Sequence, residues 1–289
     1  MKYGFVERQR SIWPVRSMCR LLKISHGGFY AWVGRSPSHS ALANERLTGL
    51  IRQSFAQSDR TYGSPRVWRD LIDWGEAVGE NRVARLMHKA QLQARRKRRR
   101  MPFDAGVRLE HCIARNVLER QFIAQAPNRK WAADLTYLST AQGWLYVAVV
   151  IDLYSRKVVG WSMSASMTSA LVIDALTMAL WRRGQPTRLL HHSDQGSQYT
   201  SEDFQRLLAD QGIECSMSRK GDCWDNAAIE SFFSSLKTER TRRKNYQTRD
   251  QARADVFAYI ERFYNPRRRH STLGHVSPDQ FEKTQVSLR

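Results

Sequence analysis

The sequence predicts two fold classes along one chain: an α/β domain preceded by small all-α modules. Before residue 95, apolar residues recur at helical spacing, and from residue 130 apolar runs typical of strands alternate with helical segments. The length of 289 residues is sufficient for two or three small domains with one sizeable core. We therefore expect a helical N-terminal part and a sheet-containing part behind it.

The first module, residues 1–40, has the pattern of a helix-turn-helix. Apolar side chains from Val15 to Leu22 share one helical face, a break follows at residues 23–25, and Ser25 is a candidate N-cap for a second helix. An ordinary αα-hairpin would show the same pattern, so both interpretations stay open here.

The second module, residues 41–94, is expected to contain three helices. Leu47, Ile51 and Phe55 mark the first helix, and Ser64 is a candidate N-cap, with Pro65 at the first helical position of the next. Gly75 should end that helix, and the third carries the apolar face Val83, Leu86, Met87 and Ala90.

From residue 130 the expected order is strand, strand, strand, helix, strand, helix, strand, helix. The expected strands are 131–138, 144–153, 158–163, 188–192 and 213–217; the expected helices are 168–183, 201–208 and about 226–237. Residues 144–153 are almost all apolar, which is typical of a central strand buried on both faces. Gly184 should end the first helix and Ser201 should cap the second.

Charge is distributed unevenly along the chain. The net charge is +20, and residues 1–130 carry 26 Lys and Arg against 10 Asp and Glu, whereas residues 131–230 carry 8 against 11. An unbroken basic run opens the expected linker 95–126: Arg95, Arg96, Lys97, Arg98, Arg99 and Arg100. Basic arms around an acidic centre favour a nucleic-acid partner, although a solvated basic linker is the alternative for the run itself.

Several classes of protein are disfavoured by composition. No window holds 18 consecutive apolar residues, so we expect no membrane span, and residues 1–10 lack the apolar segment of a secretion signal. The four cysteines make no C-x-x-C pair, so we expect reduced thiols, a cytoplasmic location and no zinc.

Three carboxylates stand where an active site could form. Asp134 interrupts an apolar strand, Asp194 follows a strand end, and Glu230 lies on the last helix of the core, with Lys237 along the same stripe. Each alone has an ordinary structural interpretation: a strand-end charge, a turn former and a solvated helix residue. Converging carboxylates, however, are what two-metal phosphoryl transfer requires.

These residues carry a resemblance to a known family. Asp134 on the first strand, Asp194 after the fourth and Glu230 on a following helix, with 35 residues between the last two, resemble the DDE core of retroviral integrases and many transposases. The segments 131–137, 192–199, 225–233, 264–274 and 62–66 are similar to those of the OrfB-type transposases of the insertion sequence IS3 family. The resemblance runs from about residue 10 to residue 285.

The resemblance implies an RNase H-like (retroviral integrase superfamily) catalytic core, residues 127–240, followed by a basic helical extension, residues 241–289. It implies an insertion-sequence transposase that uses two Mg²⁺ or Mn²⁺ ions, held by Asp134, Asp194 and Glu230, to cut DNA at element ends and to join the freed 3′-hydroxyl to a phosphodiester. Further DNA contacts are expected from Lys237, the basic run 95–100, and Arg267, Arg268 and Arg269, although these last arginines could instead pack against the acidic core.

The implied partners are double-stranded DNA, as terminal inverted repeats and target, and further copies of the chain assembled on that DNA. An upstream OrfA product is expected as a fusion or partner, because no stretch here keeps apolar a and d positions over three or four heptads. The implied location is the bacterial cytoplasm, at the nucleoid.

Two rival functions remain at this stage: a DNA-binding regulator that keeps the fold without activity, and a structure-selective nuclease. Among neighbouring polar residues, Asp152 is interpreted as structural, with a place near the metals as the alternative. His191 and His192 are interpreted as groups that orient Asp194 by hydrogen bonding, with metal ligation as the alternative. Asp222 and Asp225 are expected to serve the loop and the helix cap before Glu230.

Overall fold

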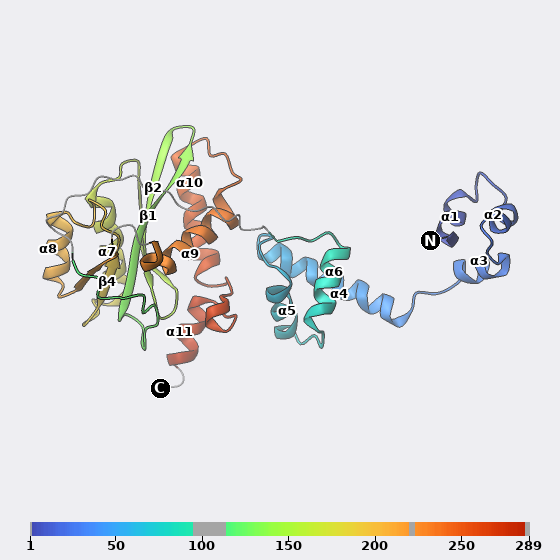
Figure 1. The fold of residues 1–289 in the computed structure, drawn as a ribbon, viewed down its shortest axis with the longest axis horizontal. Helices are drawn as coiled ribbons and strands as arrows, with labels where there is room; N and C mark the ends of the chain where they lie inside the picture. Colours follow the sequence, from blue (N-terminus) through green and yellow to red (C-terminus); the bar gives the residue numbers. More distant parts are fainter. Residues whose placement is uncertain (1, 95–113, 220–222, 287–289) are drawn as a thin grey trace. The chain divides into compact units, whose positions relative to one another are not determined.

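The structure is a computed structural model that describes residues 2–94, 114–219 and 223–286. The chain forms two compact units, residues 1–53 and 54–289 (Figure 1). In the described part of the chain, no helix combines the length and the apolar character needed to cross a bilayer. The basic run 95–100 and Asp222 lie outside the described residues.

The first unit is built on three short helices, α1 (Lys2–Gln9), α2 (Val15–Leu21) and α3 (His26–Val33), followed by the start of α4 (His39–Gln57). Val6, Met18, Cys19 and Phe29 form its small core. The expected turn and second helix are confirmed: the Ser25 hydroxyl accepts a hydrogen bond from the Gly28 amide at 3.1 Å. Helix α1 was not expected, because Val6 is its only buried residue and a lone apolar side chain gives no periodic signal.

The second unit begins with the end of α4 and with helices α5 (Ser64–Asp73) and α6 (Glu80–Lys89). Val83, Leu86 and Met87 are buried, as their helical spacing predicted, and Val67 and Leu71 are the buried residues of α5. The expected cap at Ser64 is wrong by one position, because Gly63 occupies the N-cap and no side chain bonds there.

The core of the second unit is a five-stranded sheet. Its strands are β1 (Lys130–Thr140), β2 (Gly143–Asp152), β3 (Val158–Ser164), β4 (Leu190–Ser193) and β5 (Glu214–Met217), in the spatial order β3-β2-β1-β4-β5. The first three strands are antiparallel, and β4 and β5 run parallel to β1. All five strands lie at the segments that the sequence predicted, within a few residues at their ends.

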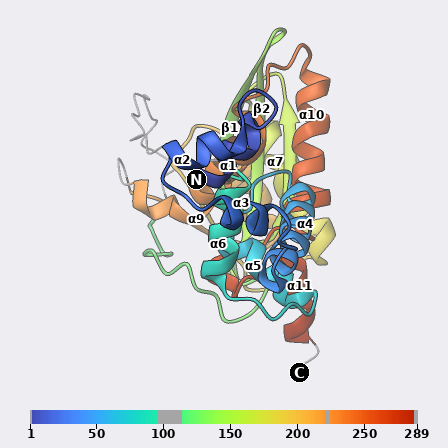
Figure 2. The same cartoon turned by 90° about the vertical axis from the view of Figure 1, so that its right-hand side faces the viewer.

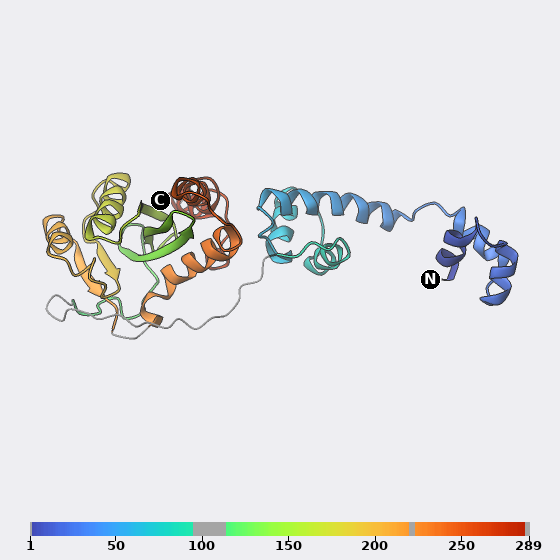
Figure 3. The ribbon, with the colours of Figure 1, turned by 90° about the horizontal axis from the view of Figure 1, so that it is seen from above.

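Helices cover both faces of this sheet. On one face α7 (Ser169–Arg183) and α8 (Glu202–Asp210) bury Trp131, Ala133 and Val150 of the strands. The other face carries α9 (Ala227–Leu236), which follows the short turn η2 (Cys223–Asn226) and contacts β1. Figure 3 shows the green strands between yellow α7 and orange α9. Helix α7 ends at Gly184 with φ 68°, and Ser201 caps α8, both as expected.

Helix α7 approaches the sheet closely at one glycine. A Cβ atom on Gly160 of β3 would lie 2.1 Å from the Ala175 carbonyl oxygen and 2.8 Å from the Ala179 side chain. Both are backbone or short rigid groups that cannot move aside, so only glycine fits at this contact.

After α9 the chain continues as a π-helical turn η3 (Lys237–Thr241), helix α10 (Arg249–Phe257), a second π-helical segment η4 (Ala258–Tyr264), the turn η5 (Ser271–Leu273) and α11 (Pro278–Val286). The β1–β2 hairpin and α10 extend together at one end of the core (Figures 1 and 2), and the Arg249 Nε donates to the Trp144 carbonyl at 3.0 Å.

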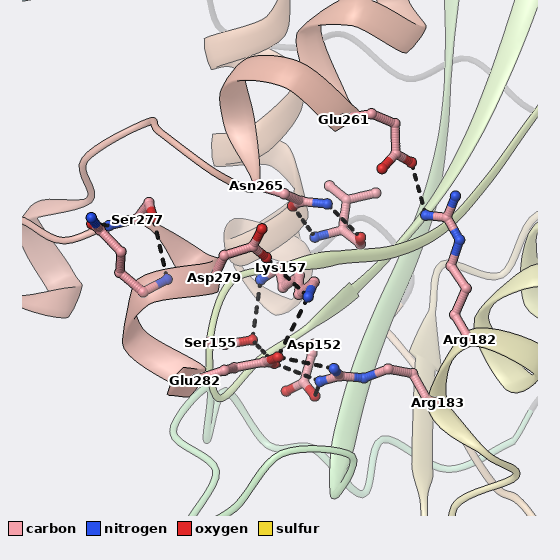
Figure 4. Close-up of polar contacts among 12 residues, drawn as sticks. Asp152, Ser155, Lys157, Arg182, Arg183, Glu261, Asn265, Ser277, Asp279 and Glu282 are labelled. Carbon is pink, nitrogen blue, oxygen red and sulfur yellow. Dashed lines mark hydrogen bonds and ion pairs between the residues drawn. The ribbon is translucent and has the colours of Figure 1, made fainter. Parts of the chain in front are cut away.

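Polar contacts hold this C-terminal segment against the sheet, as Figure 4 shows. Arg183 of α7 bonds both Asp152 at the end of β2 and Glu282 of α11, and Lys157 pairs with Asp279 at 2.9 Å. Asp152 is fully buried and also accepts from the amides of Asn128 and Tyr154. Asp152 thus ties three segments of the chain together, in agreement with its structural interpretation.

Candidate active site

Strand register brings Asp134 and Asp194 to one place. Residues Lys130, Trp131 and Ala132 of β1 pair with Leu190, His191 and His192 of the parallel strand β4. Extending this register by two residues sets Asp134 beside Asp194, and in a parallel pair such neighbours point to the same face. That face is the one that α9 covers, because Trp131 and Ala133 point to the opposite core.

Helix α9 brings Glu230 to the same face. Ile229, Phe232, Phe233 and Leu236 are its buried stripe, as the sequence predicted, and this fixes the rotation of the helix against β1. Glu230 follows one residue after the buried Ile229 and is half-buried. Lys237 begins the π-helical turn, and its Nζ lies 5.4 Å from the centre of the Tyr137 ring.

The electrostatics of Asp134 show that the three carboxylates interact. Burial, together with the nearby charges of Asp194 and Glu230, raises the pKa of Asp134 to about 8, although a hydrogen bond from the Leu135 amide at 2.7 Å and the charge of Lys237 oppose the shift. Among the described residues, no three His, Cys, Asp or Glu side chains lie in metal-ligating geometry.

An open groove of about 1250 Å³ starts at this cluster and follows β1. Asp134 and Glu230 line one end, Lys237 lies beside them, and the exposed Arg242 and Lys244 line the far part. Strand β4 pairs only with residues 130–132 of β1, so the rest of that edge faces the groove. A chain of phosphates could follow the groove to the carboxylates.

The loop after β4 is shaped around Asp194. The Gly196 amide donates to Asp194 Oδ1 at 2.9 Å, and a Cβ atom on residue 196 would lie at 2.9 Å from the same oxygen. Glycine therefore lets the backbone approach the carboxylate closely enough to bond it.

The expectation that His191 and His192 orient Asp194 by hydrogen bonding is wrong. The His191 ring packs on Tyr199 and Phe204, and the Nδ1 of His192 bonds the Ser216 hydroxyl at 2.8 Å. Burial lowers the pKa of His191 to about 3 and that of His192 to about 4, so both are neutral. Each belongs to the packing of β4 against its neighbours.

Asp225 organises the segment before α9, as expected for the loop. It is fully buried and accepts hydrogen bonds from Arg219, Arg120 and Asn116 at 2.7–3.0 Å. The bonds from Arg219 most of all, and that from Arg120, lower the pKa of Asp225. Asn226 occupies the N-cap position of α9, but no side chain bonds there, so the expected side-chain cap is not formed.

Two of the three expected C-terminal DNA contacts do not fit the structure. Arg268 is buried and bonds both carboxylate oxygens of Glu239, at 2.6 and 2.7 Å. Arg269 pairs with Asp70 at 2.8 Å and also bonds Asp73 of α5. Their charges are already matched within the protein, which is the packing alternative, whereas Arg267 is exposed.

The segment 62–66, which resembled a family motif, contacts this same C-terminal stretch. The Tyr62 hydroxyl donates to the Arg267 carbonyl and accepts from the Arg269 amide, both at 3.0 Å, and Arg66 lies 3.8 Å from Glu239. Sequence patterns gave no signal for these contacts, because the partners are about 200 residues apart in the chain.

Comparison with known proteins gives matches over most of the chain. The family model named integrase core domain matches residues 124–223, a second model of that name matches 211–278, and an HTH-like domain matches 42–100. The chain is 42% identical to the transposase InsF for insertion sequence IS3A of Escherichia coli, over 99% of this chain and 100% of that protein. It is 40% identical to a 31 kDa protein of insertion element IS600 of Shigella sonnei, over 92% of this chain and 97% of that one.

Solved structures show weaker likenesses. An intasome of simian T-cell lymphotropic virus matches with TM-score 0.45 and 16% identity, over 76% of this chain and 70% of that chain. The integrase catalytic core domain of HTLV-2 in complex with magnesium matches with TM-score 0.41 and 18% identity, over 55% of this chain and 98% of that chain.

Family membership rests on the sequence relatives and the integrase core models, which together span nearly the whole chain. All five strands of the sheet lie within the residues that the two integrase core models match. The chain belongs to the IS3 family of transposases, DDE enzymes of DNA transposition and integration with an RNase H-like integrase core.

Proposed function

We propose that Asp134, Asp194 and Glu230 hold two Mg²⁺ or Mn²⁺ ions and that the groove along β1 holds the DNA strand to be cut. The observation that carries this proposal is the interaction of Asp134 with Asp194 and Glu230 at the end of a groove that Lys237 and Arg242 line. The reaction is cleavage at element ends, followed by attack of the freed 3′-hydroxyl on a target phosphodiester.

The donor set fits a hard divalent cation. Carboxylate oxygens are the ligands that Mg²⁺ prefers, and a cation would relieve the repulsion of Asp134 by Asp194 and Glu230. When bound, the ions polarise the phosphodiester, lower the pKa of the attacking hydroxyl and stabilise the leaving oxygen.

The residues of the chain supply position. Asp134 is fixed by ladder pairing with β2, and Glu230 by the buried stripe of α9, so the two carboxylates sit on rigid elements. Lys237 is half-buried beside them, where its ammonium can hold a phosphate of the strand. Burial lowers the pKa of Lys237 and the charge of Asp134 raises it, which ties the lysine to the carboxylate end of the groove.

DNA recognition is assigned to the N-terminal modules and the basic segments. The HTH-like domain over 42–100 includes the run 95–100, whose charge suits a phosphate backbone, and Arg267 is a further candidate contact. The partners that we propose are terminal inverted repeats, target DNA, further copies of the chain and the upstream OrfA product. Because the DNA of a bacterium lies in its cytoplasm, we place the protein there, at the nucleoid.

The test is a cleavage and strand-transfer assay with Mg²⁺ on DNA that carries both element ends. Asp134→Asn, Asp194→Asn and Glu230→Gln should each lower both steps by at least about 10³-fold, because each removes ligand charge and keeps shape. DNA affinity should stay within about threefold. The matched control is Asp174→Asn, an exposed carboxylate on α7, which should act like the unmodified chain. Near-normal activity in any of the three would remove that residue from the site.

The same assay separates the remaining alternatives. DNA binding without cleavage by the unmodified chain, both alone and fused to the upstream product, would indicate a regulator. Cleavage without joining would indicate a nuclease. Activity that needs the fusion would support the proposed partner, and equal rates without it would refute that part.

A further inference from the structure

A second cavity, of about 520 Å³, lies along α9 and is unusual in its lining. Three guanidinium groups line it, those of Arg66, Arg156 and Arg268, together with His270. Ser231, Ser271 and Thr272 line it as well and are exposed, so the cavity can be reached from solvent.

Only one carboxylate, Glu239, lines the cavity among the described residues, and it is already saturated. Arg268 bonds both of its oxygens, and the Tyr259 hydroxyl donates to Oε2 at 2.8 Å. Arg66 approaches Glu239 only to 3.8 Å, beyond hydrogen-bond distance. Arg156 donates to the Phe122 carbonyl at 3.3 Å and makes no ion pair within the described ranges. Three guanidinium groups therefore share one carboxylate, which leaves the lining of the cavity with an excess of positive charge.

The pKa values of the three arginines differ in direction between Arg268, which bonds Glu239, and the other two. Burial alone would lower the pKa of Arg268, but Tyr259 and Glu239 raise it above its usual value. For Arg156 and Arg66, burial lowers the pKa, and Arg268 lowers that of Arg66 further. Burying positive charges with too few counter-charges is costly, so a cavity lined by three guanidinium groups and one carboxylate is suited to an anion.

His270 adds no charge to the cavity. Burial, together with the charges of Arg268 and Arg66, lowers its pKa to about 3. An Arg268 nitrogen lies 3.2 Å from His270 Nε2, and since arginine only donates, Nε2 is the acceptor. The cavity thus offers guanidinium forks and hydroxyl groups, which is the donor set that suits a phosphate.

We propose that this cavity binds a phosphate group, with Arg156 and Arg66 as its ligands, and that the group is a backbone phosphate of the bound DNA. The proposal deepens the proposed function and rests on it. Ser231, which lines both this cavity and the catalytic groove, directly follows Glu230 on α9. A phosphate held here would fix the DNA on the opposite flank of the helix that carries the catalytic glutamate.

The first experiment measures how DNA affinity depends on salt for the full-length chain. Each phosphate contact contributes about 0.9 to the slope of log affinity against log salt. Arg156→Gln should reduce the slope by about that amount, and Arg156→Lys should keep it. The control is Arg206→Gln, an exposed arginine of α8 on the other face of the sheet. Arg66→Gln repeats the test should the Arg156 variant fold poorly. A slope equal to that of the control for both Gln variants would overturn the proposal.

The second experiment locates the phosphate. Methylphosphonate links, which are uncharged, are placed one at a time in the element end. One position should weaken binding by the unmodified chain and have no effect on Arg156→Gln. In a parallel arm, thermal unfolding is compared in inorganic phosphate and in chloride at equal ionic strength. Stabilisation that Arg156→Gln abolishes, with an unchanged DNA slope, would assign the cavity to free phosphate instead. No loss in either arm would overturn the site altogether.

These outcomes are distinguishable from failure of the proposed function. The triad variants test cleavage at unchanged DNA affinity, whereas Arg156→Gln tests affinity and its salt slope. If the unmodified chain cuts DNA and the arginine variants keep the salt slope of DNA affinity, only the cavity proposal is refuted.

Discussion

Asp134, which is half-buried, and Asp152, which is fully buried, lie on one antiparallel strand pair and have opposite surroundings. Asp152 ends β2 opposite Trp131 and accepts from two backbone amides and from Arg183. Asp134 lies three residues further along β1, beside two more carboxylates, and no ion pair reaches it within the part of the chain that the structure describes. Burial raises the pKa of both aspartates. At Asp152 two backbone hydrogen bonds and Arg183 oppose this rise, whereas at Asp134 the charges of Asp194 and Glu230 add to it.

The difference separates a structural charge from a functional one. A buried carboxylate stabilises the fold when residues of the protein supply all of its hydrogen-bond donors. A buried carboxylate that faces other carboxylates at the end of a basic groove is incomplete without a cation and a substrate. Within one strand pair, the charge of Asp152 is thus matched by donors of the protein, whereas that of Asp134 faces other carboxylates.

The largest effect on stability is expected from removing Arg183, the cation that pairs with Asp152. Arg183→Gln leaves Asp152 and Glu282 buried without their shared cation, and should lower the free energy of unfolding by about 3–5 kcal/mol. Denaturant unfolding of the full chain measures it. The folded fraction should still cut DNA at the normal rate, because this contact lies away from the groove. Loss of cleavage at unchanged stability would contradict the claim that the contact between Arg183 and Asp152 serves only the fold.

A smaller effect is expected where the matched charges are less buried. Arg269→Gln should lower the free energy of unfolding by about 1.5–3 kcal/mol, because it removes charged hydrogen bonds to Asp70 and Asp73. Asp70→Asn in the same background should add little, since the two changes break one interaction. A double mutant whose losses simply sum would show that Arg269 and Asp70 do not act as a pair.

The smallest effect should have the opposite sign. In metal-free protein, Asp134→Asn should raise the free energy of unfolding by about 1 kcal/mol, or about 2–4 °C in Tm, because it removes repulsion. The folded-state pKa is raised to about 8, so this aspartate contributes no penalty below about pH 4 and a growing one as pH rises towards 8. The advantage of the variant should therefore grow between pH 5 and pH 8. A constant or shrinking difference would show that Asp134 is not raised in this way.

Local patterns predicted most of the core. The apolar run 144–153 predicted β2, and the spacing of Ile229, Phe232, Phe233 and Leu236 predicted which face of α9 is buried, and hence where Glu230 lies. Ser25, Gly184 and Ser201 ended or capped helices as their chemistry predicts. These features depend on neighbours in sequence, where periodicity and capping operate.

Long-range pairing was beyond the reach of such patterns. Nothing in the run Arg267 to Arg269 shows that one arginine is exposed while the next two find Glu239 and Asp70. The same holds for Arg156, a turn residue by sequence and a lining residue of an unmatched cationic cavity in the fold. The π-helical turn at Lys237 also has no sequence signal here, although it sets where that lysine points.

The most direct test of the account is the effect of Mg²⁺ on thermal unfolding at pH 7.5, without DNA, for three proteins. We predict that Mg²⁺ raises the Tm of the unmodified chain and of Arg183→Gln, and that it leaves the Tm of Asp134→Asn unchanged. An equal Mg²⁺ shift in Asp134→Asn would contradict the claim that this end of the sheet is the one completed by a cation.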